Sequence, residues 1–133
     1  QRVKERGMLF GLYAEIETIG FDSELFEKHP DWCLMRNGRP LTGFQRTKRS
    51  MLDLTKPEVA SWVESEICRL IEEYELDLFR LDANVRLIFD GGERFADGYL
   101  ESTFWRYYEA LYGIWERVGR RYPHVILQQA SSG

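Results

Sequence analysis

The stretch Leu78–Asn84 is the part of the sequence that most restricts the fold. An apolar run gives way there to a cation, a carboxylate and an amide at alternate positions, which are Arg80, Asp82 and Asn84. Successive side chains of a strand point to opposite faces, so these three share one face and the intervening apolar residues share the other. Such a strand is typical of a parallel α/β sheet or barrel, in which ligands bind beyond the carboxyl ends of the strands. A purely structural pair of Arg80 with Asp82 explains this stretch equally well.

Hydrophobic periodicity predicts further strands and helices on both sides of this stretch. Strands are expected over residues 8–17 and 124–129, and helices over about 57–74 and 99–121. In the first strand, Tyr13, Glu15 and Glu17 alternate with apolar residues, so they are expected to share a face near its carboxyl end.

Strands that alternate with helices imply right-handed crossovers and a parallel sheet. A (β/α)8 TIM barrel needs about 250 residues, so a chain of 133 residues supplies about three of its β/α units. The fold class expected is therefore α/β, with residues 1–133 forming part of a catalytic barrel domain truncated at both ends. No glycine-rich phosphate loop follows any predicted strand, which argues against a nucleotide cofactor.

Local signals predict the connections. A short helix is expected over residues 22–28, and polar loops over 36–50 and 86–98. Thr55 and Glu58 have the spacing of a capping box, with Pro57 in the first turn of the helix that follows. The loop at 36–50 is locally basic, which favours a solvated loop and leaves contact with an anion or a sugar as the alternative. The basic residues are Arg36, Arg39, Arg46, Lys48 and Arg49.

Composition excludes several classes of function. Lys and Arg number 18 against 22 Asp and Glu, without the basic block that a nucleic-acid backbone requires. No apolar run approaches the roughly 20 residues of a membrane helix. Cys33 and Cys68 lack metal or redox spacing, so we expect free thiols, a reducing compartment such as the cytoplasm, and no metal site. His124 starts a strand at the end away from Asp82, which favours a structural histidine.

Several stretches resemble the melibiase-type α-galactosidases of glycoside hydrolase family 36. Residues 10–17 are similar to that family's FGLWxEPE strand, and residues 22–32 to its DSELYxxHPDW segment. Residues 52–59 match LDLTxPEV, residues 80–84 match KWDMN, and residues 130–133 resemble the start of CSSGGGR. Each match is weak alone, but their order and spacing agree along almost the whole chain.

The resemblance implies a (β/α)8 barrel and a retaining exo-glycosidase that removes terminal α-galactose from oligosaccharides, without a cofactor. Asp82 falls on the family's nucleophile, which attacks the anomeric carbon and forms a glycosyl-enzyme. The family's acid/base Asp comes from the strand after the CSSGGGR loop, beyond Gly133. We therefore interpret the chain as an excerpt of a larger protein, whose oligomeric state, including a homo-oligomer, stays open.

The resemblance also carries over substrate-binding positions. Arg80 stands where the family has a sugar-binding Lys, and Asn84 matches a substrate-contacting Asn. Tyr13 replaces a Trp that flanks the galactose, Ala130 replaces a Cys near the sugar, and Gly133 matches the first Gly of the loop.

Two further carboxylates are expected in the pocket, and the cation that the family has there is not found at its usual position. Glu15 and Glu17 are expected at the same strand end as Asp82, as further substrate-binding residues. The family's sugar-contacting Arg corresponds to Thr47 here, with Arg46 and Arg49 as neighbours, so its role is unassigned. The departures lie in the sugar pocket, so a related α-glycosidase, an α-N-acetylgalactosaminidase, an α-galactosyl transferase or a carbohydrate-binding pseudoenzyme stays open.

We expect the isolated chain to be inactive and poorly folded. Three barrel strands leave two unpaired edges, and the helices find only part of their packing. Thermal unfolding of the purified chain followed by circular dichroism tests this, because a single cooperative transition would contradict it.

Overall fold

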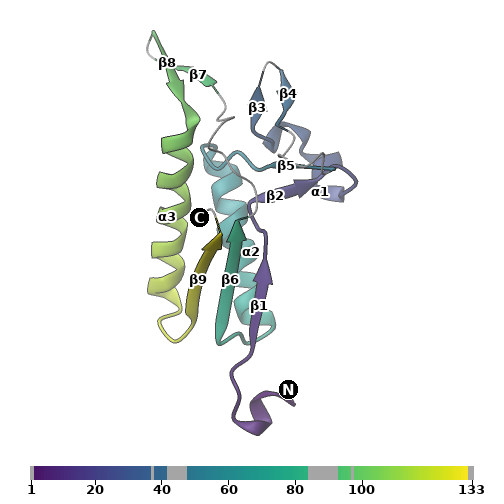
Figure 1. Cartoon of the computed structure of the whole chain (residues 1–133), viewed down its shortest axis with the longest axis vertical. Helices are drawn as coiled ribbons and strands as arrows, with labels where there is room; N and C mark the ends of the chain where they lie inside the picture. The colour runs from purple at the N-terminus through teal and green to yellow at the C-terminus, as the bar shows by residue number, and fades with distance from the viewer. Residues whose placement is uncertain (1, 37, 42–47, 84–92, 97, 132–133) are drawn as a thin grey trace.

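A three-stranded parallel sheet forms the lower half of the molecule, and smaller elements lie beyond the carboxyl ends of its strands (Figure 1). In spatial order the strands are β1 (Gly11–Ala14), β6 (Leu78–Ala83) and β9 (Ile126–Ser131). Both pairs are parallel, which confirms the parallel sheet predicted from the sequence. The computed structural model describes residues 2–36, 38–41, 48–83, 93–96 and 98–131.

Two long helices connect the strands. Helix α2 (Pro57–Glu73) precedes β6, and α3 (Thr103–Arg121) lies between β6 and β9. Because the strand order follows the chain order, each connection moves one strand further in the same direction. Right-handed crossovers of this kind put both helices on one face of the sheet and leave the other face for ligands or further core.

The core lies between the sheet and these helices. Phe79 and Leu81 of β6 are completely buried, and the Phe79 ring meets the Trp115 ring of α3 edge-on at 5.9 Å. Helix α2 contributes five buried residues to the same cluster, which are Val59, Val63, Ile67, Cys68 and Ile71. The alternation predicted for β6 therefore holds at Phe79 and Leu81, which face the core.

Most of the smaller elements lie above the carboxyl ends of the strands, whereas the N-terminal turn η1 lies below their amino ends (Figure 1). Strand β2 (Thr18–Gly20) pairs antiparallel with β5 (Arg49–Met51), which brings the end of the basic segment back to the chain that leaves β1. The remaining elements are η1 (Lys4–Arg6), α1 (Glu24–Lys28), η2 (Pro30–Trp32), the β3–β4 pair (Met35–Arg36, Arg39–Pro40) and the β7–β8 pair (Glu93–Ala96, Tyr99–Ser102).

The first strand is shorter than the sequence predicts. The alternation suggests residues 8–17, but β1 ends at Ala14. A turn follows, in which the Thr18 N–H donates to the Glu15 carbonyl at 3.1 Å. The turn breaks the period of two, so the residues after Ala14 no longer alternate between the two faces of the sheet.

Both predicted polar loops contain strands. The described parts of 36–50 and 86–98 include β4, the start of β5 and all of β7, and α3 begins at Thr103 rather than at Tyr99. These strands have two to four residues, too few to produce a readable period. The third strand is also displaced, to Ile126–Ser131.

The predicted capping box is wrong. Helix α2 begins after Lys56, which makes no side-chain cap, and the Thr55 hydroxyl donates instead to the Asp53 carboxylate at 2.6 Å. Pro57 does occupy the first turn, where its missing N–H breaks no helical hydrogen bond. The short helix is confirmed at Glu24–Lys28. Cys33 and Cys68 are free thiols as expected, and both are buried.

No helix in the described part of the chain is both long and apolar enough to cross a membrane.

Replacing Phe79 by Ala is expected to destabilise the fold strongly. The substitution opens a cavity at a completely buried position of β6 and removes the contact with Trp115, which costs about 3–5 kcal/mol. The matched control is Tyr112→Ala on the exposed side of α3, where the residue is 54% exposed and the cost is below about 1 kcal/mol. Thermal unfolding of both variants in the whole protein measures the difference, and equal midpoints would contradict this core assignment.

Candidate functional site

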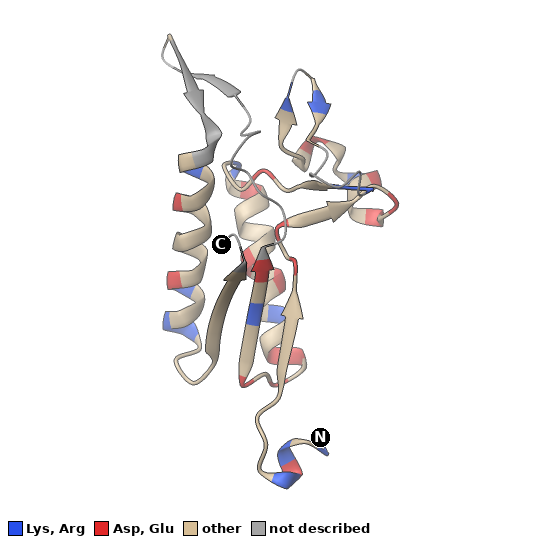
Figure 2. Ribbon diagram, in the orientation of Figure 1, with Lys and Arg blue, Asp and Glu red and all other residues tan. Residues whose placement is uncertain are grey.

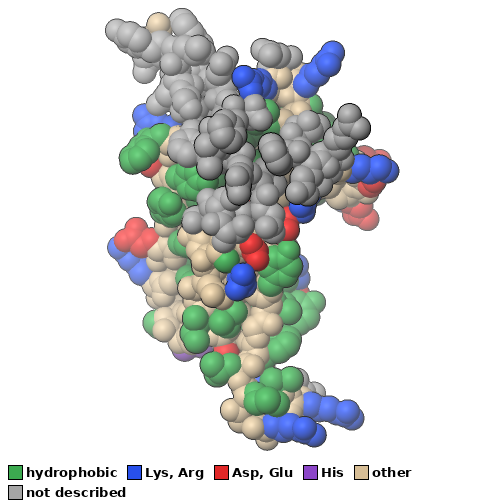
Figure 3. Space-filling model, in the orientation of Figure 1, with side chains coloured by type: hydrophobic (Ala, Val, Ile, Leu, Met, Phe, Trp, Pro, Cys, Tyr) green, Lys and Arg blue, Asp and Glu red, His purple; other side chains and the backbone are tan. Residues whose placement is uncertain are grey.

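The strand register stacks polar side chains on the face of the sheet opposite the buried core. Tyr13 of β1 pairs with Arg80 of β6, which pairs in turn with Gln128 of β9. One layer closer to the carboxyl ends, Asp82 pairs with Ala130. Paired residues of neighbouring strands point to the same face, so all five lie together. Figure 2 shows the acidic and basic positions of β6 near its carboxyl end, and the surface view in Figure 3 shows charged and hydrophobic side chains side by side there.

Asp82 and Arg80 form an ion pair within β6. Arg80 Nη2 lies 3.1 Å from Asp82 Oδ2, and the two side chains are 39% and 24% exposed. The other terminal nitrogen of Arg80, Nη1, donates to Gln128 Oε1 of β9 at 3.5 Å. Asp82 therefore presents a carboxylate at the carboxyl end of the central strand, beside a cation that is held by two neighbours.

A second charged group lies where the chain leaves β1. The Tyr13 hydroxyl donates to Glu15 Oε1 at 2.9 Å, and Arg49 Nη1 pairs with the other oxygen, Glu15 Oε2. The hydrogen bond to Glu15 is the main reason that the pKa of the Tyr13 hydroxyl is raised, with smaller contributions from desolvation and from the charges of Glu15 and Asp82. The Tyr13 ring itself is 56% exposed and lies open on the face that carries Asp82.

Glu17 lies in a different environment from Glu15. It is 2% exposed, whereas Tyr13 is 56% exposed, so the prediction that these two residues share a face of β1 is wrong. The turn at Glu15–Thr18 redirects the chain into β2, and Glu17 points into the interior. Within the described residues neither oxygen of its carboxyl group has a hydrogen-bond partner.

Burial raises the pKa of the Glu17 carboxyl group. Desolvation raises its pKa to about 7, and the charges of Glu15 and Asp82 act in the same direction. Its own backbone N–H and the Arg49 cation lower the pKa, but only in part. Glu17 is also among the charges that raise the pKa of the completely buried Tyr107 on α3, after desolvation as the main cause. A buried carboxyl without a partner is stable in its neutral form.

Sequence reasoning missed two residues of this site. Arg49 was named only as a neighbour of the position of the family's sugar-contacting Arg, without a partner, and Gln128 was one of several polar residues in the third strand. The β2–β5 pairing brings Arg49 to Glu15, and the β6–β9 register brings Gln128 to Arg80. Neither the pairing nor the register can be read from local periodicity.

Several predicted site residues lie outside the described part of the chain. These are Asn84 and Gly133, together with Thr47 and Arg46 of the basic segment. Ala130 is described, half-buried on β9 opposite Asp82.

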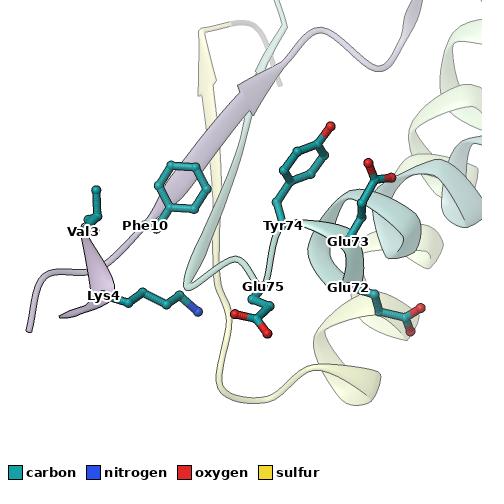
Figure 4. A pocket seen from close by; sticks show the side chains of 7 residues that line it. All are labelled: Val3, Lys4, Phe10, Glu72, Glu73, Tyr74 and Glu75. Atoms are coloured by element: carbon teal, nitrogen blue, oxygen red, sulfur yellow. The ribbon is translucent and has the colours of Figure 1, made fainter. Parts of the chain in front are cut away.

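The structure has a pocket at the opposite end of the sheet (Figure 4). It lies between the N-terminal segment and the end of α2, near the amino ends of the strands, and is lined by Val3, Lys4, Phe10, Glu72, Glu73, Tyr74 and Glu75. Ligands of parallel β/α folds bind at the carboxyl ends, so we assign the site to Asp82 and not to this pocket. No cluster of three or more potential metal ligands occurs among the residues that the structure describes.

A parallel β/α sheet with a carboxylate at the end of its central strand is typical of ligand-binding α/β proteins, including the TIM-barrel enzymes. The melibiase family model matches residues 1–133, and the chain belongs to this family. Curated relatives are α-galactosidases. The bifunctional α-galactosidase/sucrose kinase AgaSK of Mediterraneibacter gnavus is 31% identical over 99% of this chain, and the α-galactosidase of Escherichia coli is 31% identical over 98%.

Solved structures of the same family share the fold. AgaA of Geobacillus stearothermophilus, in a variant crystallised with stachyose, is 28% identical over 99% of this chain with a TM-score of 0.84. The galactosidase domain of AgaSK is 32% identical over 99% of this chain with a TM-score of 0.78. The chain covers 17% of the E. coli enzyme, 13% of AgaSK and 18% of the AgaA structure, so it corresponds to a small part of each relative.

Replacing Glu17 by Gln is expected to stabilise the protein increasingly as the pH rises. The pKa of Glu17 in the fold is about 7, above its ordinary value of 4.5, so folding favours the neutral acid. The free energy of unfolding of the wild type therefore falls relative to that of Glu17→Gln as the pH rises above 4.5. The difference reaches its full value above pH 7, at about 3 kcal/mol at most. Thermal unfolding of the whole protein from pH 5 to pH 8 measures it.

The control is Glu58→Gln, which removes an exposed carboxylate from the first turn of α2. This variant should show no comparable rise with pH. A Glu17→Gln midpoint that falls relative to wild type between pH 5 and pH 8 would mean that Glu17 is ionised in the fold.

Proposed function

We propose that the whole protein is a retaining α-galactosidase in which this chain supplies about three β/α units of a (β/α)8 barrel and Asp82 is the nucleophile. The observation that carries the proposal is the position of the Asp82 carboxylate. It lies at the carboxyl end of the central strand, on the face away from the core, 3.1 Å from Arg80 Nη2. Family membership and the sequential strand order support the barrel.

The chemistry that we propose proceeds in two displacements. An Asp82 oxygen attacks the anomeric carbon of an α-galactoside through an oxocarbenium-like transition state, and the bond to the leaving oxygen breaks as an acid outside this chain protonates that oxygen. In retaining enzymes the two carboxyl groups are about 5–5.5 Å apart. The same outside group then takes a proton from water, whose oxygen attacks the anomeric carbon and releases Asp82 and galactose.

The neighbours of Asp82 have distinct proposed roles. Arg80 orients the Asp82 carboxylate and keeps donors available for sugar hydroxyls. The exposed Tyr13 ring covers an apolar face of the sugar, because an aromatic face packs well on the C–H groups of a sugar ring. Asn84 and the backbone near Ala130 and Gly133 would contact the remaining hydroxyls, as the family resemblance implies. Glu15 and Glu17 would support the site from behind rather than touch the sugar.

An α-galactosyl oligosaccharide is the proposed substrate class. Structures of AgaA variants have been solved with stachyose and with raffinose, which supports oligosaccharides of this type for a protein with the same fold. The aryl α-galactoside that was crystallised with the Thermus thermophilus enzyme TtGalA is a convenient test compound.

Replacing Asp82 by Ala should abolish hydrolysis of p-nitrophenyl α-galactoside by the whole protein. Loss of a covalent nucleophile lowers kcat by about 10⁴-fold or more, and azide should restore turnover by forming β-galactosyl azide in the vacated space. Asp22→Ala is the matched control, since Asp22 is 79% exposed in an ion pair with Lys48.

The outcomes separate the parts of the proposal. Activity of Asp82→Ala equal to wild type would refute the assignment of the nucleophile. Activity on another α-glycoside that depends on Asp82 would keep the chemistry and overturn the galactose assignment. A folded wild-type protein without turnover on any α-glycoside would favour a carbohydrate-binding pseudoenzyme.

A further inference from the structure

Arg49 is a charged residue next to the site to which the proposed chemistry gives no role. It starts β5, where it pairs with Gly20 of β2, and its guanidinium reaches back to a carboxylate 34 residues earlier in the chain. Arg49 and Glu15 are 34% and 14% exposed, so the ion pair is partly enclosed and less open to solvent than a surface pair. Enclosed pairs are screened less by salt and water than surface pairs, so their geometry is better defined.

Glu15 connects Arg49 to the exposed aromatic ring. One of its oxygens accepts the hydrogen bond from the Tyr13 hydroxyl at 2.9 Å, and the other pairs with Arg49. A carboxylate engaged at both oxygens cannot rotate without losing a partner. Hydrogen bonds to ionised groups are also stronger than those between neutral groups. The same hydrogen bond is the first cause of the raised pKa of the Tyr13 hydroxyl.

We propose that Arg49 is a positioning residue that acts through Glu15 to fix the tilt of the Tyr13 ring over the sugar. The proposal rests on the proposed function in one respect, which is that the Tyr13 ring covers the substrate. Three segments meet in this arrangement, because Tyr13 belongs to β1, Glu15 to the turn after it, and Arg49 to β5. Arg49 of the basic segment therefore affects sugar binding indirectly, by orienting the Tyr13 ring.

The kinetic consequence is a change in substrate binding with little change in the chemical step. The ring covers the sugar both in the ground state and in the transition state, and uniform binding of this kind affects KM and not kcat. Loss of one charge-assisted hydrogen bond corresponds to a rise of about 10-fold in KM. Arg49→Met and Tyr13→Phe should each produce this rise, and the double variant should show no further rise, because both substitutions interrupt the same chain of contacts.

Lys48→Met is the matched control. It removes the neighbouring cation of the same segment, whose ion pair with Asp22 at 3.5 Å is 83% and 79% exposed. Exposed pairs of this kind contribute little, so KM should stay within about 2-fold of wild type. Arg49→Lys, which keeps a cation near Glu15, should recover part of the loss. A purely structural role for Arg49 would instead lower kcat and the folded fraction without this pattern.

A second measurement tests the inference without relying on activity. 3-Fluorotyrosine at position 13 of the whole protein gives a fluorine resonance that reports the surroundings of the ring. We expect it to move in Arg49→Met and to stay in place in Lys48→Met. An unchanged resonance in Arg49→Met would overturn the inference. It would also be overturned if the KM effects of Arg49→Met and Tyr13→Phe multiplied in the double variant.

The two proposals fail in different ways. If the whole protein does not hydrolyse α-galactosides in an Asp82-dependent manner, the proposed function is wrong, and the fluorine resonance still decides whether Arg49 positions Tyr13. If hydrolysis depends on Asp82 but neither KM nor the resonance responds to Arg49→Met, only the positioning role is wrong.

Discussion

The alternation of side chains along β6 is the constraint on which both the core and the site depend. The helices pack against one face of the sheet, so every second residue of this strand has to be apolar, and Phe79 and Leu81 are completely buried. The residues between them point to the opposite face, where an ionised side chain keeps contact with water. Asp82 therefore reaches the open face of the sheet although it directly follows a buried residue, and its side chain is 24% exposed.

Opposite charges organise the polar face. Arg80 and Asp82 pair within one strand, whereas Arg49 and Glu15 pair across 34 residues of sequence. Each carboxylate thus has a cation next to it, which offsets the repulsion between two acidic groups at neighbouring strand ends. The two pairs also differ in exposure, since the Glu15 side chain is 14% exposed and that of Asp82 24%. The less exposed pair, Arg49 with Glu15, supports the neighbouring Tyr13. The more exposed pair, Arg80 with Asp82, lies on the open face of the sheet.

Glu15 and Glu17 show how one turn separates two residues that look alike in the sequence. Both follow the first strand at alternate positions, and a continued strand would place them on one face. The turn that starts at Glu15 ends the alternation, so Glu15 meets Arg49 near the surface while Glu17 enters the interior. Desolvation then raises the pKa of Glu17 to about 7, whereas Glu15 forms an ion pair with Arg49.

The sequence alone determined the parallel β/α order, the buried face of β6, the family and the position of Asp82, since each of these follows from local periodicity or from contiguous motifs. Prediction of strands from the sequence failed where a strand is too short to show alternation, as in β5. It also failed where a turn interrupts the alternation, as after Ala14. Only the tertiary structure decided that Arg49 meets Glu15, that Gln128 meets Arg80 and that Glu17 is buried. These contacts join segments 34 and 48 residues apart, or depend on a turn, and side-chain alternation along one segment carries no information on which other segment it will pair with or in which register.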